Sequence, residues 1–202
     1  LIMNKQLLVD VINFDVSPTA INESINKNNG KLIVQGILQR AGAKNQNGRI
    51  YPRDILMREA EQYSSTQIKE RRALGELDHP DSSVVNLQNA SHNITEMHWN
   101  GDDLLGTVEV LSTPSGNILK ELFKSGIKLG ISSRGLGSVQ EMHEDNAVEV
   151  QDDFELIAFD FVSNPSTHGA FMFPMNEGVD KTKTTNKWNK VETIINDIMR
   201  GV

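Results

Sequence analysis

Residues 92–111 read HNITEMHWNGDDLLGTVEVL, and this stretch decides the fold class. Polar and apolar residues alternate over residues 92–99, which is the pattern of a β-strand with one buried face. Asn100-Gly101 follows directly and is a strong signal for a two-residue hairpin turn. Residues 104–111 then supply an apolar return strand. The stretch therefore predicts an antiparallel hairpin, and with it a sheet built from neighbouring strands.

Further strands are predicted on both sides of this hairpin, from short apolar runs bounded by turn residues. They cover residues 6–12, 31–40, 128–133, 136–143 and 147–162, with an Asn-rich loop around residues 26–30 after the first. The order of elements lacks the strand–helix–strand alternation that is typical of a parallel sheet.

Two helices are embedded among these strands. Pro52 opens the first, because proline tolerates the first helical position. Its apolar residues recur with helical spacing at Ile55, Leu56, Ala60 and Tyr63. Thr113-Pro114 opens the second helix, which has one apolar face and ends at Gly126. We therefore expect an α+β fold in which an antiparallel β-barrel is flanked by helices.

The C-terminal part of the sequence differs in character. Residues 176–187 are polar and predict a linker. Residues 188–199 predict an amphipathic helix, with Trp188, Val191, Ile194, Ile195, Ile198 and Met199 on one face. We expect a main domain over residues 1–175, a linker over 176–187 and a helical segment over 188–202. This segment is either a removable docking element or a helix that packs on its own domain or in an oligomer.

The composition excludes several classes of protein. With no cysteine among 202 residues, disulfides, thiol nucleophiles and thiolate metal sites are ruled out. No apolar run approaches the ~18 residues of a membrane span, and the first residues lack the layout of a signal peptide. No basic cluster points to nucleic acid. We expect a soluble, unsecreted chain that binds neither membranes nor nucleic acid.

The net charge of −7 has a local origin, because residues 141–160 hold eight acidic residues and no Lys or Arg. In a strand over residues 147–162, Asp160 falls in phase with the apolar positions Phe154 and Leu156. A carboxylate on an apolar face needs a partner. A histidine, an arginine or a set of backbone amides would each serve.

Three of the five histidines lie in informative positions. His79 precedes Pro80 in a loop, where it is either an ordinary surface histidine or a general base of fixed orientation. His92 and His98 lie an even number of residues apart on one predicted strand, so they should share a face. Two imidazoles on one face could bind a metal, but the sequence offers no third ligand nearby.

The segment GISSRGLGS at residues 130–138 places two serines at the end of an apolar strand. The residues alone favour a Gly-rich hairpin, then an anion-binding loop, and only then a catalytic nucleophile. Arg134 occupies the place of the second glycine in the G-x-S-x-G elbow, so the segment is not a hydrolase elbow of that type.

Taken together, these segments resemble the prohead core proteases of T-even-like tailed phages, which are capsid-maturation serine proteases related in fold to herpesvirus assemblins. The resemblance is carried by NGRIYPRDIL (47–56), ALGELDHP (73–80), the hairpin at 94–110 and GISSRGLGS, and more loosely by AFDFVSNPSTHGA (158–170). It spans about residues 30–175. Its specific feature is GELDHP followed downstream by SSRG.

The resemblance implies a catalytic set. The family's histidine falls on His79, and its nucleophile falls on Ser132, the first serine of SSRG. The family's acidic position falls on Asp160, where the herpesvirus relatives carry a second histidine. Asp152 and Asp153 are the alternatives in a different strand register.

The resemblance also implies the remaining parts of the site. Ser133, Arg134 and Gly135 would form the oxyanion loop, with Arg134 ordering it. No cofactor and no metal are implied. Residues 1–175 would be the serine protease domain, acting on scaffold or core proteins and on the major capsid protein. It would work inside the prohead, in the host-cell cytoplasm, and a homo-oligomer stays open.

Relatives of this kind cut after Glu, with an aliphatic residue two positions earlier. The chain carries this pattern at residues 21–23, 68–70 and 94–96, and more loosely at 175–177. We expect self-cleavage at one or both of 21–23 and 175–177, because both lie in predicted loops near the ends. Two alternatives remain: a catalytically silent capsid-assembly component with the same fold, and a metal-dependent hydrolase that uses His92 and His98.

Overall fold

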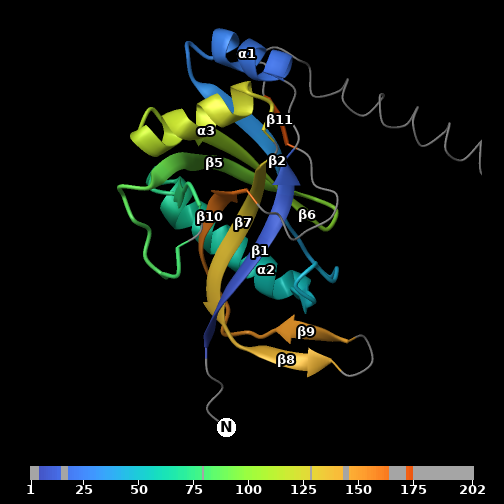
Figure 1. The fold of residues 1–202 in the computed structure, drawn as a ribbon. Coiled ribbons are helices and arrows are strands. Elements are labelled where there is room, and N and C mark those ends of the chain that lie inside the picture. Colours follow the sequence, from blue (N-terminus) through green and yellow to red (C-terminus); the bar gives the residue numbers. More distant parts are fainter. Residues whose placement is uncertain are drawn as a thin grey trace, which may run out of the picture.

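The computed structural model describes residues 5–14, 18–78, 80–127, 129–142, 146–163 and 172–174. Within these residues the strands form three sheets, with helices packed against them (Figure 1). The first sheet is antiparallel and three-stranded, with β7 in the centre. Its order is β1 (Gln6–Phe14), β7 (Leu129–Gly137) and β10 (Glu155–Val162). This sheet carries Ser132, Arg134 and Asp160, which belong to the candidate site.

The second sheet is antiparallel and five-stranded. Its order is β11 (Met172–Pro174), β2 (Leu32–Arg40), β6 (Asp103–Val110), β5 (Ala90–Asn100) and β4 (Leu74–Glu76). The third sheet is small and projects from one end of the molecule in Figure 1. Its order is β3 (Arg49–Ile50), β9 (Ala147–Val150) and β8 (Val139–Met142), and β3 pairs with β9 in parallel.

The hairpin predicted from residues 92–111 is confirmed. Strands β5 and β6 pair antiparallel, with Asn100 opposite Asp103 across the turn. Gly101 in that turn has a φ of 60°, a left-handed conformation that glycine adopts without steric cost. The register of β5 shifts between Ile94 and Glu96, and this bulge changes which side chains face the core.

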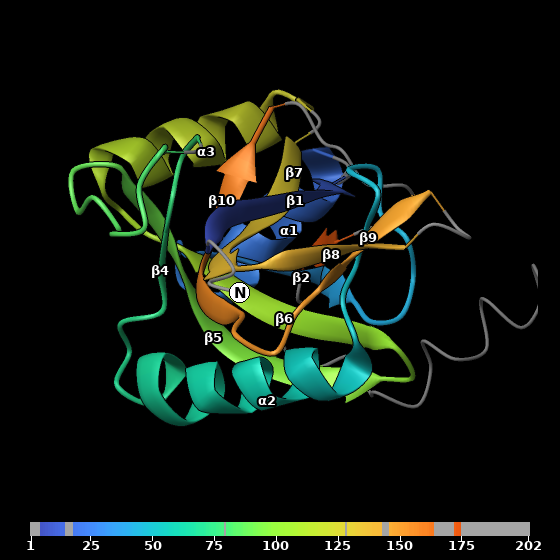
Figure 2. The same ribbon diagram turned by 90° about the horizontal axis from the view of Figure 1, so that it is seen from below.

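Both predicted helices are confirmed. α2 (Arg53–Tyr63) buries Ile55, Leu56, Ala60 and Tyr63 and continues into a π-helical turn, η1 (Ser64–Ile68). α3 (Pro114–Lys124) is capped by Thr113, whose side-chain oxygen accepts from the amide of Gly116 at 3.0 Å. Figure 2 shows α2 and α3 on opposite sides of the molecule, with the strands of the sheets between them.

A further helix, α1 (Pro18–Lys27), lies between β1 and β2, and no helical pattern in the sequence predicts it. Its sequence is rich in Asn and Ser, which are weak helix formers. Packing compensates for this weak helix propensity, because Ile21 and Ser24 are fully buried. The Ser24 hydroxyl also donates to the carbonyl of Ile33 at the start of β2, at 2.8 Å.

The expected barrel is only partly right. The fold is α+β, with mostly sheets and a few helices, but the described strands form separate sheets and no closed barrel. An isolated parallel bridge between Leu77 and Phe161 links the end of β4 to β10. This bridge brings the segment after β4 against the first sheet.

Aromatic side chains fill the space between the sheets and the helices. Phe159 and Phe161 of β10 are both fully buried. Phe159 packs edge-on against Tyr63 of α2, with ring centroids 5.9 Å apart, and Phe161 packs against Phe123 of α3 at 5.5 Å. Ala158, Asp160 and Val162, which alternate with these two residues along β10, are buried as well. Both faces of this part of β10 are therefore covered, and Asp160 lies deep in the protein.

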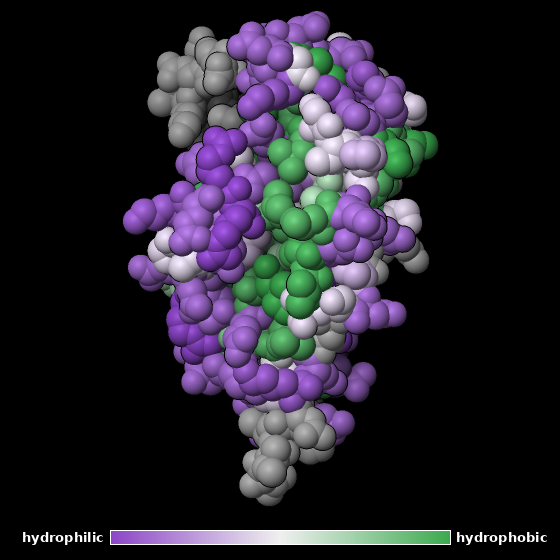
Figure 3. Space-filling model, turned by 90° about the vertical axis from the view of Figure 1, so that its left-hand side faces the viewer, coloured by the Kyte–Doolittle hydropathy of each residue, from purple (hydrophilic) through white to green (hydrophobic). Residues whose placement is uncertain are grey.

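The surface carries some apolar side chains as well. Figure 3 shows apolar residues gathered in a band down the face that lies on the left in Figure 1. The most exposed large hydrophobic residues of the described chain are Val84 and Leu87 in the loop after β4, and Ile118 in α3. No helix among the described residues is long and apolar enough to cross a membrane.

The predicted linker at 176–187 and the predicted helix at 188–199 lie outside the described residues. The proposed cleavage site at 21–23 lies within α1 and not in a loop, and Ile21 is buried there. The prediction of an accessible loop at this position is therefore wrong. The pattern at 175–177 lies outside the described residues.

Candidate active site

The segment GISSRGLGS forms most of β7, the central strand of the first sheet. The sequence-based prediction of a hairpin or loop here is wrong. The glycines serve close packing instead of a turn. A Cβ atom at Gly135 would lie 2.3 Å from a ring carbon of Phe154 and 2.7 Å from the carbonyl oxygen of Glu155. Ser133, Arg134 and Gly135 therefore lie in a strand with partners on both sides.

Ser132 and Asp160 are directly opposite each other on β7 and β10. Directly opposed residues of an antiparallel pair project from the same face of a sheet, with Cβ atoms ~5 Å apart. Both residues are fully buried. The Ser132 hydroxyl lies 3.5 Å from the carbonyl oxygen of Ser133, at the outer limit of a hydrogen bond. The predicted nucleophile and the predicted acid are therefore neighbours across two strands.

Ser133 belongs to the opposite face of β7 and is held by a different contact. Its hydroxyl accepts from the side-chain amide of Gln39 in β2, with an Nε2–Oγ distance of 2.8 Å. Gln39 is itself buried. The two serines of the segment therefore face different surroundings, and Ser132 is the one that shares a face with Asp160.

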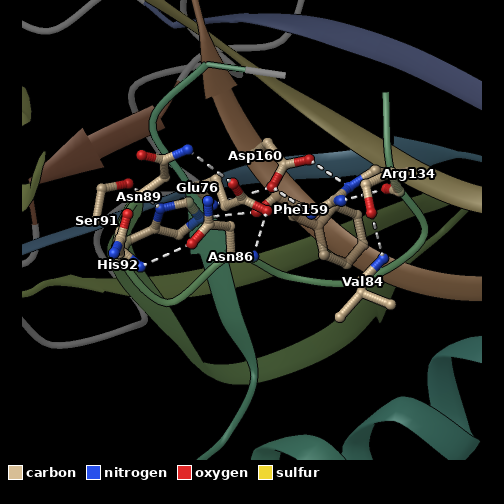
Figure 4. A network of polar contacts seen from close by, with 11 residues as sticks. Glu76, Val84, Asn86, Asn89, Ser91, His92, Arg134, Phe159 and Asp160 are labelled. Atoms are coloured by element: carbon tan, nitrogen blue, oxygen red, sulfur yellow. Dashed lines mark hydrogen bonds and ion pairs between the residues drawn. The ribbon is translucent and has the colours of Figure 1, made fainter. Parts of the chain in front are cut away.

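Arg134 lies two residues beyond Ser132 and on the same face. Its guanidinium is fully buried and donates to Asp160 from two nitrogens, Nε to Oδ2 at 2.8 Å and Nη2 to Oδ1 at 3.1 Å. Nη2 also donates to Oε1 of Glu76 at 3.1 Å, and Nη1 donates to the carbonyl of Ser82 at 2.5 Å. Figure 4 shows this network between β4, β7 and β10.

Glu76, at the end of β4, completes the network. Its backbone amide donates to Oδ1 of Asp160 at 3.0 Å, and its carboxylate accepts from the backbone amide of Asn86 at 2.9 Å. The side chain is fully buried. Glu76 and Asp160 are thus two buried carboxylates that share the guanidinium of Arg134. Buried charges require such pairing, because each alone would be very costly to desolvate.

The partner that Asp160 needs is therefore an arginine and a backbone amide, two of the alternatives that the sequence left open. Asp160 is buried, as predicted from its phase. The long strand expected over residues 147–162 is interrupted, however, because β9 ends at Val150 and β10 begins at Glu155. A bulge between Leu156 and Ala158 further shifts the register of β10.

His79 lies outside the described residues, but the structure describes the chain on both sides of it. Asp78 has a φ of 70°, a left-handed conformation that is uncommon for a non-glycine residue. Its amide donates to the carbonyl of Phe161 at 2.8 Å, which ties this backbone to β10. On the other side, Ser82 is held by Arg134. The loop that contains position 79 is therefore attached to the first sheet at two points.

His92 and His98 do not share a face, contrary to the prediction, because the bulge in β5 lies between them. His98 is exposed, whereas His92 is fully buried. The ring of His92 bonds through Nε2 to the carbonyl of Phe159 and through Nδ1 to the hydroxyl of Ser91, each at 2.8 Å. Burial lowers the pKa of His92 to about 4. His92 is thus a neutral core residue.

Burial also affects Tyr63, which packs near this network on α2. Desolvation, with a smaller contribution from the charge of Asp160, raises the pKa of its hydroxyl well above the usual value. Within the residues that the structure describes, no group of three His, Asp or Glu side chains is arranged to hold a metal ion.

The alternative acids lie elsewhere. Asp152 is exposed and accepts from the guanidinium of Arg58 at 2.5 Å. Asp153 accepts from both the amide and the hydroxyl of Ser138, at 2.9 and 2.8 Å. Both residues belong to the turn between β9 and β10. The structure brings neither to the face that carries Ser132.

Comparison with known proteins places this arrangement in a family. Residues 15–182 match the model of the prohead core protein serine protease family. The chain belongs to this family. It is 34% identical over 146 residues to the prohead core protein protease of Enterobacteria phage T4, across 71% of this chain and 68% of that protein.

The fold agrees with this membership of the prohead core protein serine protease family. The solved structure of the bacteriophage T4 capsid assembly protease superimposes with a TM-score of 0.69 at 26% identity. The match covers 80% of this chain and 99% of that structure. Membership in a protease family makes peptide-bond hydrolysis the activity that the geometry has to explain.

Sequence reasoning missed Glu76 as a part of the site. Glu76 lies in GELDHP, the segment that also contains His79. An acidic residue at the end of an apolar strand, three positions before a histidine, was a usable signal. What the sequence lacked was its partner, because the ion pair to Arg134 joins residues 58 positions apart.

Proposed function

We propose that this chain is the capsid-maturation serine endopeptidase of a tailed phage, with Ser132 as nucleophile, His79 as general base and Asp160 as the orienting acid. The observation that carries the proposal is the position of Ser132 opposite Asp160 on one face of the first sheet. The loop with position 79 is attached to the same sheet through Asp78 and Ser82. Family membership supports the same chemistry.

In the proposed mechanism, His79 removes the proton from the Ser132 hydroxyl as Oγ attacks the scissile carbonyl carbon. The tetrahedral intermediate collapses when His79 returns this proton to the leaving amine, which leaves an acyl group on Ser132. Water, activated by the same histidine, then hydrolyses the ester and regenerates the serine. Asp160 orients the imidazole and stabilises its charged form.

The negative charge on the carbonyl oxygen needs hydrogen-bond donors, and removing one such donor costs about 3–4 kcal/mol of barrier in known hydrolases. We assign this role to the backbone of Ser133, Arg134 and Gly135. In the described arrangement these residues lie in the ladders of β7 with β1 and β10. One of their amides must therefore turn from its strand partner toward the substrate. Arg134 holds the surrounding strands in place.

The proposed substrates are the scaffold or core proteins and the major capsid protein of the immature prohead, within the host-cell cytoplasm. This part of the proposal is supported by the names of the relatives, which are a prohead core protein protease and a capsid assembly protease of phage T4. We also propose that the fold is related to that of the herpesvirus assemblins.

We propose cleavage after Glu and self-cleavage at 175–177. The pattern at 21–23 is the poorer candidate, because Ile21 is fully buried in α1 and the helix would have to open before a protease could bind it. Intact masses of the purified chain, followed over time, test this order of the two sites. A first cut after Glu23 would contradict it.

The proposed activity is tested by incubating a prohead core protein with the purified chain and with Ser132→Ala, Ser133→Ala and His79→Ala. We expect Ser132→Ala and His79→Ala to be inactive and Ser133→Ala to retain cleavage. Normal cleavage by Ser132→Ala, with loss in Ser133→Ala, would show that the nucleophile is wrongly assigned. Normal cleavage by all three variants would reject the serine-protease mechanism and favour a contaminating protease.

A further inference from the structure

We propose that Glu76 is a positioning residue of this site, whose buried carboxylate fixes the loop 77–89 against the strand that carries Ser132. The proposal rests on the proposed function, because the loop matters for catalysis only if His79, which belongs to it, is the general base. Among the described residues of the proposed site, Glu76 contacts Asp160 through its backbone amide and Arg134 through its carboxylate.

The first step of the argument is the fixing of the loop ends. Oε1 of Glu76 accepts from the backbone amide of Asn86 at 2.9 Å, and Oε2 lies 3.4 Å from the side-chain amide of Asn89. The amide of Leu77 donates to the carbonyl of Asn89 at 3.0 Å. The chain thus leaves β4 at Glu76 and returns to the same residue ten positions later, as Figure 4 shows for Asn86 and Asn89.

The second step is the link between loop and sheet. The same Oε1 atom accepts from Nη2 of Arg134 at 3.1 Å, and Nη1 of Arg134 donates to the carbonyl of Ser82. Arg134 lies two residues after Ser132 on β7. Glu76 and Arg134 therefore join the base and the middle of the loop to the strand of the proposed nucleophile.

The third step concerns charge and solvent. The side chains of Glu76 and Arg134 both have no exposed surface. In this setting an ion pair is sensitive to the loss of either member, since the remaining charge would be buried without compensation. The loop itself is open to water, because residues 81–84 and 86–89 are exposed. An exposed loop with few apolar contacts depends on such polar anchors for its conformation.

Glycine 75 adds a further observation, because it places β4 unusually close to β10. A Cβ atom at this position would lie 1.9 Å from the carbonyl oxygen of Phe159 and 2.3 Å from Nε2 of His92. This close approach lets the backbone amide of Glu76 reach Asp160. The GELDHP segment thus contains its own anchor, with Gly75 for approach and Glu76 for attachment.

The test uses the full chain with Glu76→Ala and Glu76→Gln. The matched control is Glu59→Gln, because Glu59 in α2 is also a buried carboxylate that accepts from a backbone amide of β10, that of Leu156 at 3.0 Å. Hydrogen exchange measures the protection of the amides of Leu77, Asp78 and Asn86. Cleavage of a peptide substrate gives kcat and KM, and thermal unfolding reports the stability of each variant.

We expect Glu76→Ala to raise exchange of these amides at least tenfold and to lower kcat about 100-fold, with KM within about twofold. Glu76→Gln retains an acceptor for Asn86 and should restore part of kcat. Glu59→Gln should lose stability without either effect. If Glu76→Ala does not fold, the test uses Glu76→Gln alone. We then expect kcat to fall about fivefold, which is the effect of weakening one hydrogen bond.

Wild-type exchange in the Glu76 variants would overturn the proposal, as would an equal fall of kcat in Glu59→Gln at equal loss of stability. Failure of the proposed function is seen separately, because it appears as undiminished cleavage by Ser132→Ala. The exchange measurement needs no activity, so it decides the role of Glu76 in the loop in either case.

Discussion

Arg134 and Asp160 form a two-point ion pair in the interior, with N–O distances of 2.8 and 3.1 Å and no exposed side-chain surface on either residue. The pair links β7 to β10, and Asp160 also lies directly opposite Ser132 across these two strands. The carboxylate of Asp160 neutralises a buried guanidinium, and in the proposed mechanism it also orients His79.

Asp160→Asn should lower kcat by about 10⁴-fold, as the loss of the orienting aspartate does in serine proteases of the Ser-His-Asp type. The physical reason is that an amide cannot balance the imidazolium that forms during attack. Steady-state cleavage of a peptide, with circular dichroism to confirm folding, measures the effect. A loss of only a few-fold in a folded variant would place the third catalytic residue elsewhere.

Arg134→Met should lower the free energy of unfolding by about 3–5 kcal/mol, because it leaves Glu76 and Asp160 buried without their shared cation. Urea unfolding measures this loss. Arg72→Met is the control, since Arg72 pairs with Glu70 at the surface, and it should cost less than about 1 kcal/mol. Equal effects of the two substitutions would contradict the structural role of Arg134.

Gly75→Ala should destabilise the protein by about 1–3 kcal/mol, because its Cβ atom would overlap the carbonyl oxygen of Phe159 and the ring of His92. Gly101→Ala gives the comparison. Gly101 has open space around it and a φ of 60°, so its substitution should cost about 1 kcal/mol of backbone strain alone. If Gly75→Ala unfolded at the wild-type midpoint, β4 and β10 would have to lie farther apart than the contact of Gly75 with Phe159 requires.

Stability should fall as the pH is lowered from about 6.5 to about 4, because His92 has a pKa of about 4 in the folded protein and 6.5 as its ordinary value. A lowered pKa for a base means that the unfolded chain binds the proton first, so acid favours unfolding. The difference corresponds to about 3 kcal/mol. His92→Gln should remove this pH dependence, as measured by urea midpoints between pH 4 and 7. If the urea midpoints of the wild type and of His92→Gln fell in parallel as the pH is lowered, the burial of neutral His92 would not be the cause of the pH dependence.

Much of the local structure could be predicted from the sequence, because the signals lie within short stretches. The hairpin 92–111 has its turn at Asn100-Gly101, and α3 has its cap at Thr113. α1 could not be predicted in this way, since packing of Ile21 and Ser24 outweighs its weak propensity. The segment GISSRGLGS was also misleading, because its glycines locally indicate a turn. In the structure, Gly135 and Gly137 instead leave room for the ring of Phe154 to pack on β7.

The candidate site was predictable in its residue types and less so in its contacts. The phase of Asp160 correctly predicted a buried carboxylate, but a one-residue bulge in β5 separated His92 from His98. The pairing of Glu76 with Arg134 depends on how distant strands come together, and no local pattern contains that information. The sequence therefore indicated which segments matter, and the structure shows how they are joined.

Covalent labelling identifies the nucleophile, which we propose to be Ser132. The chain is treated with a fluorophosphonate probe under conditions in which it cleaves a prohead core protein, and the modified residue is located by mass spectrometry of peptides. We predict a single adduct on Ser132 that is absent in His79→Ala. An adduct on Ser133, or undiminished labelling of Ser132→Ala, would show that Ser132 is not the nucleophile.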